Sequence, residues 1–335
     1  MLIIKFVQSP LVLPSQERNK LEFVNRDIVS IKDFTRPELE YIFEKAKEIE
    51  EKGYDRSILK GKRVGLLFYE PSTRTRMSFD TAAQALGADT IWFAGVEGTS
   101  VMKGETLKDT IETVANYVDV IVMRHPFDGS ARWAADVTTK RAKQGLKKVP
   151  IVNGGDGKNE HPTQTMLDLY SIQKTQGRID GLEVALVGDL KYGRTTHSLS
   201  YALSMFDTRI GYVAPEALQI PAHVVSFLKQ KGIAQTKYSR IEDVIETADV
   251  IYMTRIQKER FPDENEYNKV KGVFRIDKSL LSRAKPTMRL MHPLPRVDEI
   301  AVDADDDQRS YYFQQAGNGV PVRATLLALI MGAVA

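Results

Sequence analysis

Short apolar runs alternate with segments of helical spacing along most of the chain. The run Val64–Tyr69 is followed by a helix-like segment, Met77–Leu86, which Gly87 ends. Apolar runs of this length, separated by helical segments, are typical of buried parallel strands, because parallel strands need helical crossovers. By this pattern we predict strands at 64–69, 90–93, 118–123 and 149–152, and helices at 36–53, 77–86, 107–117, 131–145 and 162–175.

A second series of the same kind begins at Glu183. It predicts strands at 184–188, 209–213, 234–238, 250–254 and 288–292, and helices at 195–206, 221–231 and 241–247. Two consecutive series in 335 residues predict an α/β fold with two doubly wound parallel-sheet domains. The chain ends in an apolar helix, 324–334, which we expect to pack back on the first domain.

Composition narrows the class of protein further. Hydrophobic residues make up 42% of the chain and charged residues 27%, which is ordinary for a globular protein. The formal charge of +3, from 47 Lys and Arg against 44 Asp and Glu, argues against a dedicated nucleic-acid binder. Cysteine is absent, which excludes disulfides, thiolate metal sites and cysteine nucleophiles and fits a reducing compartment such as the cytoplasm.

No apolar run approaches the roughly 18 residues that a membrane span needs, so we expect no membrane partner. Residues 1–14 are apolar but lack a small-residue cleavage site, which argues against a signal peptide. Up to about Asn25 we expect a loosely attached extension.

Ligands of open parallel sheets bind at the carboxyl ends of strands, so the turns there carry the candidate chemistry. The turn after Tyr69 contains Ser72, Thr73, Arg74 and Thr75 at the start of a helix. Free N–H groups at a helix start favour an anion, and guanidinium groups add fixed donors for phosphate oxygens. This turn predicts an oxyanion site; the alternative is an ordinary capped helix with solvated charges.

Two other turns of the first series carry polar groups. Arg124 directly follows the strand at 118–123, and His161 precedes a helix whose first residue is Pro162. His161 offers a hydrogen-bond donor for a carbonyl oxygen, and Gln164, one turn into the helix, offers an amide that can read another amide. Taken alone, Arg124 is explained equally well as a surface arginine, and a capping histidine is the more common explanation of an isolated His-Pro pair.

The second series has similar turns. Arg194 follows Gly188–Gly193, a segment that differs from a P-loop because Arg replaces the required Lys, and Asp189 would repel phosphate. We therefore expect Arg194 to hold a carboxylate. Arg255 and Gln257 follow the strand at 250–254 and form either a polar fork or an ordinary charged loop.

One long loop and three His-Pro pairs remain. The glycine-bordered loop 95–104 carries Ser100 and Lys103, which either close over an anion or belong to a surface loop. No His of the pairs at 125, 161 and 292 lies four residues from another, so we predict no metal site. A set rich in Arg, hydroxyl and amide groups suits anion binding and stabilisation of charge in a transition state.

Three motifs resemble those of carbamoyltransferases and occur in the same order: Ser72–Arg76, His161–Gln164 and His292–Arg296. The segments Val187–Thr195 and Met253–Phe261 make the resemblance specific to the catalytic chains of aspartate carbamoyltransferases. It runs from about residue 28 to the C-terminus. It implies transfer of the carbamoyl group of carbamoyl phosphate to the amine of L-aspartate in pyrimidine synthesis, without a cofactor.

The resemblance also implies how the domains are divided. Residues 27–160 together with 312–335 would form the carbamoyl-phosphate-binding domain, and 161–311 the aspartate-binding domain, with the active site in the cleft between them. Residues 1–26 would be an N-terminal extension outside the resemblance.

By the same resemblance, Ser72, Thr73, Arg74 and Thr75 hold the phosphate, and Arg124 bridges phosphate and carbonyl. His161 and Thr75 polarise the carbonyl. The catalytic residues it implies are Arg74, Thr75, Lys103, Arg124 and His161.

Further substrate contacts are implied in the same way. Gln164 and the backbone at Pro293 and Leu294 would read the carbamoyl amide. The aspartate carboxylates would be bound by Arg194, Arg255 and Gln257.

The resemblance also implies one contact between subunits and one between domains. A neighbouring subunit would lend Ser100 and Lys103 to the site, which implies a homotrimer with shared active sites. Glu70 would pair with Arg194 and Arg260 across the domains. The sequence leaves open whether regulatory chains associate.

Three alternative activities fit less well. Ornithine carbamoyltransferases resemble this chain in the phosphate turn, but they bind a cationic substrate and carry a cysteine where Pro293 stands. Arg194 and Arg255 would repel the ammonium group of ornithine. A nicotinamide-dependent dehydrogenase is disfavoured because GxGxxG is missing. A non-catalytic anion-binding protein would have no use for His161 and Gln164.

Overall fold

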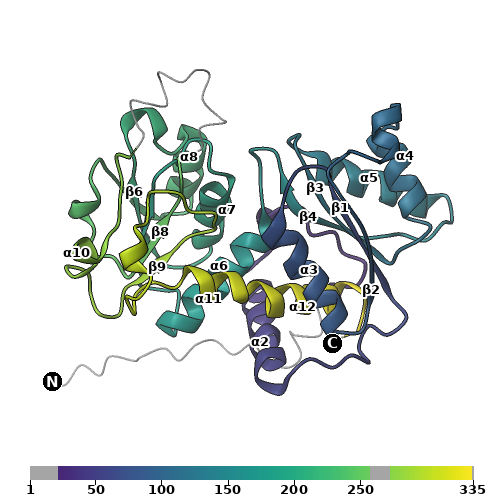
Figure 1. Cartoon of the computed structure of the whole chain (residues 1–335), viewed down its shortest axis with the longest axis horizontal. Helices are drawn as coiled ribbons and strands as arrows, with labels where there is room; N and C mark the ends of the chain where they lie inside the picture. The colour runs from purple at the N-terminus through teal and green to yellow at the C-terminus, as the bar shows by residue number, and fades with distance from the viewer. Residues whose placement is uncertain (1–21, 257–271, 334–335) are drawn as a thin grey trace.

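The computed structural model describes residues 22–256 and 272–333. Two sheets form the centres of two α/β domains, which lie next to each other in Figure 1. The first sheet has the order β2-β1-β3-β4, and the second the order β7-β6-β5-β8-β9. Every pair of neighbouring strands is parallel. The prediction of two parallel-sheet domains is therefore confirmed.

The strands lie close to the predicted positions. Those of the first sheet are β1 (Arg63–Phe68), β2 (Asp89–Ala94), β3 (Val120–His125) and β4 (Ile151–Asp156). Those of the second are β5 (Glu183–Val187), β6 (Arg209–Val213), β7 (Ala234–Tyr238), β8 (Val250–Met253) and β9 (Arg289–Met291).

Helices connect the strands. The α-helices are α2 (Arg36–Lys52), α3 (Thr73–Ala85), α4 (Leu107–Val114), α5 (Ser130–Lys143), α6 (Pro162–Gln176), α7 (Arg194–Leu203), α8 (Ala222–Gln230), α10 (Lys278–Leu281), α11 (Tyr312–Gly317) and α12 (Gly319–Ile330). Short 3₁₀ helices are η1 (Ile31–Asp33), η2 (Ser100–Lys103), η3 (Glu216–Leu218), η4 (Ile241–Asp243) and η6 (Val302–Ala304).

Alternating side chains along the strands cover both faces of each sheet. In β1, Val64 and Leu66 belong to one hydrophobic cluster, whereas Leu67 belongs to another on the opposite face. In β5, Val184 faces the first of these clusters and Ala185 a third. Because successive side chains of a strand point to opposite faces, both sheets are covered by helices on both sides, as a doubly wound fold requires.

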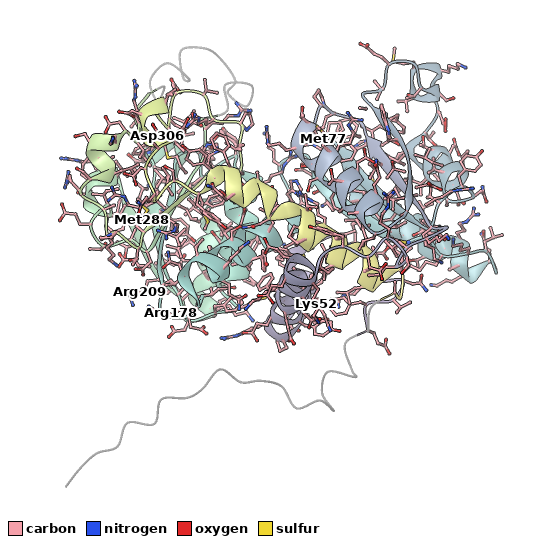
Figure 2. The ribbon with its side chains drawn as sticks, turned by 60° about the horizontal axis from the view of Figure 1, so that its bottom comes forward. Lys52, Met77, Arg178, Arg209, Met288 and Asp306 are labelled. Atoms are coloured by element: carbon pink, nitrogen blue, oxygen red, sulfur yellow. The ribbon has the colours of Figure 1, made fainter. Side chains whose placement is uncertain are left out.

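The largest cluster continues from the first domain into the second through α6 and α12. Figures 1 and 2 show α11 and α12, in yellow, crossing between the domains. Helix α12 packs against α2, α3 and α6, so the expected packing of the tail on the first domain is confirmed. It starts at Gly319, earlier than predicted, and is buried on all sides, which explains why it lacks a polar face.

One predicted helix is wrong. The segment predicted as a helix at 241–247 forms only the 3₁₀ turn η4, whose three-residue period places buried Ile241 and Val244 on one face. The division of the chain at residue 26 stays a prediction, but the structure shows how residues 23 and 25 are placed. Phe23 is buried, and the backbone N–H of Asn25 donates to the carbonyl of Ile330 at 2.8 Å, so these residues pack on the domain.

Within the two described ranges, no helix is long and apolar enough to cross a membrane.

Candidate active site

The strand order reverses between β1 and β3 in the first sheet and between β5 and β8 in the second. Crevices at such reversals, beyond the carboxyl ends of the strands, are where open α/β sheets bind ligands. A cavity of about 640 Å³ lies there, and both domains line it. The predicted site residues that line it are Ser72, Thr73, Arg74, Thr75, Arg124, His161, Gln164, Arg194, Arg255, Pro293 and Leu294.

Two predicted site residues within the described part of the chain are not among those that line the cavity. Ser100 and Lys103 lie on η2, where both are exposed to solvent. Gln257 lies outside the described residues, as does Arg260.

The lining also includes residues that sequence reasoning missed, above all Gln315 of α11 and Arg323 of α12. Arg323 is buried and donates a hydrogen bond to the Ser78 hydroxyl at 2.7 Å. A signal for it exists in the sequence, since it is the only charged residue after Arg309. A lone charge in a helix that is otherwise apolar points to a buried polar contact.

The turn after β1 leads directly into the amino end of α3. Ser72 is the N-cap residue in extended conformation, it makes no side-chain cap hydrogen bond, and the first turn of α3 contains no acidic residue. The backbone N–H groups at this end are therefore open to an anion. Burial and the nearby charges of Arg124 and Arg255 lower the pKa of Arg74, which shows that three guanidinium groups converge here.

Glu70 connects the two domains at the edge of this turn. Its Oε1 atom accepts hydrogen bonds from Nε of Arg124 at 2.7 Å and from Nη2 of Arg194 at 3.3 Å. Arg194 also donates to the carbonyl of Gly157 at 2.5 Å. The predicted pairing of Glu70 with Arg194 is confirmed, and its pairing with Arg260 lies outside the described residues.

Gly155 makes room for the Arg194 guanidinium. A Cβ atom at this position would lie 3.2 Å from Cζ of Arg194, and the backbone φ angle is +117°. Both the close approach and the backbone conformation favour glycine. A larger residue would displace the arginine from the cavity wall.

His161 is the N-cap residue of α6, as predicted, and is buried. Its Nε2 atom lies 3.3 Å from the Thr75 hydroxyl. Burial, followed by the charges of Arg194, Arg124 and Arg323, lowers the pKa of His161 well below 6.5, so the ring is neutral at pH 7.

The neutral ring carries its proton on one nitrogen. Nδ1 is buried and has no hydrogen-bond partner among residues 22–256 and 272–333. An orphaned buried N–H is rarer than an orphaned acceptor, so the proton is assigned to Nε2, beside Thr75. His161 is thus a neutral donor surrounded by fixed positive charge.

The loop after β9 brings backbone groups to the opposite wall of the cavity. Leu294 has a φ angle of +58°, which is uncommon for a residue with a side chain, and a cis peptide bond joins it to Pro295. Its N–H donates to Nδ1 of His292 at 2.7 Å, which holds the loop in this conformation. A positive φ angle at a residue with a side chain is costly and is found mainly at functional sites.

Within residues 22–256 and 272–333, no group of three or more His, Asp or Glu side chains is placed to hold a metal ion. The donors that converge are guanidinium, hydroxyl, amide and neutral imidazole groups.

The fold and the cavity define the class of protein: a two-domain α/β protein that binds small anions in the cleft between its domains. Comparisons with known proteins identify the family. Residues 26–174 match the carbamoyl-P binding domain of aspartate/ornithine carbamoyltransferases, and residues 180–330 match the Asp/Orn binding domain of the same proteins. The chain belongs to the aspartate/ornithine carbamoyltransferase family.

Individual relatives agree with this assignment. The aspartate carbamoyltransferase catalytic subunit of Thermococcus gammatolerans is 47% identical over 93% of this chain and 99% of its own length. The solved catalytic subunit of M. jannaschii aspartate transcarbamoylase is 45% identical with a TM-score of 0.83, covering 92% of this chain and 98% of that one.

The aspartate transcarbamoylase of Trypanosoma cruzi has been solved in complex with carbamoyl phosphate and aspartate. It is 36% identical with a TM-score of 0.84, and the match covers 92% of this chain and 98% of that one.

Proposed function

We propose that this chain transfers the carbamoyl group of carbamoyl phosphate to the amine of L-aspartate, giving N-carbamoyl-L-aspartate and phosphate for pyrimidine synthesis. One observation carries the proposal. Arg74 and Arg124 from the first domain line the same cavity as Arg194 and Arg255 from the second, with the neutral donor His161 between them. Such a cavity suits one phosphorylated substrate and one dicarboxylate.

The phosphate binds at the amino end of α3. The hydroxyl groups of Ser72, Thr73 and Thr75 and the free N–H groups there supply neutral donors, and Arg74 and Arg124 supply charge. Charge-assisted hydrogen bonds from guanidinium to phosphate are about twice as strong as neutral ones. The phosphate group is therefore anchored on the first domain.

The carbonyl oxygen lies beside Nε2 of His161, the Thr75 hydroxyl and Arg124. The amine lone pair attacks the carbonyl carbon, so the new C–N bond forms and negative charge develops on this oxygen. The tetrahedral intermediate collapses as the C–O bond to phosphate breaks, and the leaving phosphate accepts the amine proton. These three donors stabilise the oxyanion, and no protein base is needed.

Arg194, Arg255 and Gln257 bind the two carboxylates of aspartate. Half-buried guanidinium groups favour a dicarboxylate and oppose the ammonium side chain of ornithine. Glu70 links the two domains through its ion pairs with Arg124 and Arg194, and all three residues line the cavity. Closure would exclude water and bring the amine to roughly 3–3.5 Å from the carbonyl carbon.

We propose further that the chain acts as a homotrimer in which Ser100 and Lys103 complete the site of a neighbouring subunit. Strand β2 is an edge strand and exposes Trp92 at 54% of its surface, and Met77, labelled in Figure 2, is exposed at 56% on α3. Exposed large apolar side chains next to an edge strand favour burial by another chain.

Shared sites are tested by mixing two variants, Arg74→Ala and Lys103→Ala, at a carbamoyl phosphate concentration below the wild-type KM, where each variant alone should have little activity. Every mixed trimer then retains one site without either substitution, so random mixing should restore about a quarter of the wild-type activity. Sedimentation should give three chains per particle. No recovery in trimers shown to be mixed would contradict sharing.

The activity itself is tested by incubating the chain with carbamoyl phosphate and either L-aspartate or L-ornithine, and measuring the carbamoylated product by colour. We expect product with aspartate and none above background with ornithine. Product only with ornithine would show that the chain is an ornithine carbamoyltransferase and would refute the proposed substrate. No turnover with either amine would leave an anion-binding protein and refute the proposal.

A further inference from the structure

Asp168 lies on α6, one helical turn beyond Gln164, and is completely buried. Its carboxylate accepts hydrogen bonds from three elements of the fold. Nε2 of Gln164 donates at 2.9 Å, Nε2 of Gln315 on α11 at 2.6 Å, and the hydroxyl of Tyr252 on β8 at 2.8 Å. None of the motifs singled out in the sequence contains this residue.

The carboxylate fixes which way the Gln164 side chain faces. An ionised carboxylate only accepts hydrogen bonds, so it can bind only the NH₂ end of a side-chain amide. With its NH₂ held by Asp168, Gln164 has to present its carbonyl oxygen elsewhere, and the residue lines the cavity. Gln164 therefore offers an acceptor to a bound molecule.

Asp168 also acts on the opposite wall through Gln315. While the NH₂ of Gln315 binds Asp168, its Oε1 accepts the backbone N–H of His292 at 2.8 Å. Nδ1 of His292 accepts the N–H of Leu294 at 2.7 Å, and its Nε2 lies 2.8 Å from Glu299. In each of these hydrogen bonds one group can only donate and the other can only accept. The carboxylate of Asp168 therefore fixes the orientation of the Gln315 amide, which in turn determines that its oxygen faces the His292 backbone N–H.

We propose that Asp168 is a positioning residue for substrate specificity, whose carboxylate orients Gln164 and, through Gln315 and His292, the backbone of Pro293 and Leu294. The groups so oriented present carbonyl acceptors to the cavity, and these recognise the NH₂ of the carbamoyl group. The inference rests on the proposed function, because it concerns the same substrate.

A purely structural role explains the carboxylate less well. Burial raises the pKa of Asp168 to about 6, so the charged form is costly at this place. Buried charges can often be replaced by apolar residues of similar size without loss of stability. An acceptor that cannot donate is needed only if the direction of the surrounding hydrogen bonds matters.

The test uses two inhibitors that differ only at the group to be recognised. Phosphonoacetamide carries the NH₂ of the carbamoyl group, and 2-oxopropylphosphonate carries a methyl group in its place. Titration calorimetry gives Kd for each, without need of turnover. We expect the wild-type chain to bind the amide more tightly than the ketone.

The variant Asp168→Leu keeps a similar size but removes Oδ1, the oxygen that accepts from both glutamine amides, so neither amide is held in its orientation. We expect its Kd for the amide to rise by about 10- to 100-fold, a typical effect of losing buried hydrogen bonds, while Kd for the ketone changes less than about threefold. Gln315→Met removes the hydrogen bonds of Gln315 with Asp168 and with the His292 backbone but leaves the bond between Asp168 and Gln164, so it should change the ratio of the two Kd values in the same direction by a smaller factor.

Tyr252→Phe is the matched control, because it removes a hydrogen bond from the same carboxylate without touching either amide. We expect a lower melting temperature and an unchanged ratio of the two Kd values. If Asp168→Leu and Gln315→Met weaken the binding of both compounds equally, or leave both Kd values unchanged, the inference is wrong. Should Asp168→Leu not fold, Gln315→Met alone decides. If the wild-type chain turns over aspartate but both variants keep its ratio of the two Kd values, the inference is refuted and the proposed function stands.

Discussion

Replacing His161 by alanine tests the proposed chemistry at its centre. The side chain lies at the start of α6 with Nε2 3.3 Å from the Thr75 hydroxyl, and it is neutral because burial and nearby arginines lower its pKa. His161→Ala removes one fixed donor from the place where the oxyanion forms. It leaves the phosphate turn and the arginines of the second domain in place.

The expected size of the effect follows from that single donor. Loss of one preorganised oxyanion donor costs about 2.7–4 kcal/mol, which is roughly a 100- to 1,000-fold decrease in kcat. KM for carbamoyl phosphate should change little, because the phosphate contacts remain. His161→Gln should recover part of the loss, since its amide NH₂ can reach the position of Nε2.

The assay is steady-state formation of carbamoyl aspartate with each substrate varied in turn. His223→Ala is the control, because His223 is exposed and does not line the cavity. Thermal unfolding of all three variants separates misfolding from lost chemistry. A His161→Ala enzyme with kcat within about fivefold of wild type, or with its loss confined to KM, would refute the assignment of His161.

Three further predictions concern charge. Arg74→Ala should raise KM for carbamoyl phosphate by about 10- to 100-fold in steady-state assays, whereas Arg178→Ala, at an exposed position, should leave it unchanged. The same KM for both variants would contradict phosphate binding by Arg74. Glu70→Gln keeps the shape but removes the charge between two arginines, so KM for aspartate should rise by about tenfold, with exposed Glu97→Gln as control. Because the pKa of His161 is lowered in the folded state, the unfolded chain binds a proton first as pH falls, and the free energy of unfolding should decrease below about pH 6.5. Denaturant unfolding at several pH values should show a shallower decrease for His161→Gln, and an identical slope would contradict a neutral buried ring.

Although the edge strands β2 and β7 are mostly exposed or half-buried, hydropathy located the central strands well because they are buried on both faces and form nearly continuous apolar runs. It placed the end of β3 too early. Arg124 and His125 continue the ladder, pairing with Phe68 and Asp156, although their side chains are polar. Strand ends that carry site residues are polar for functional reasons, and an apolar pattern cannot show them.

The turns after β1, β3, β5 and β8 were found from the sequence because ligand-binding residues of parallel sheets cluster at carboxyl ends. Gln315 and Arg323 were missed because they reach the cavity from the C-terminal helices, through contacts distant in sequence. Asp168 was missed for a different reason. Helix α6 is buried nearly all round, so no polar face marks which of its charged residues is internal.

The proposed activity requires that phosphate-binding groups of one domain and carboxylate-binding groups of the other face the same cavity. Titration calorimetry with N-(phosphonacetyl)-L-aspartate, which joins a phosphonate to the dicarboxylate, tests this most directly. We predict one molecule bound per chain, with Kd raised at least about tenfold by Arg74→Ala on the phosphate side and equally by Arg255→Ala on the carboxylate side. Binding that responds to only one of these substitutions, or two molecules bound per chain, would contradict a single cavity for both substrates.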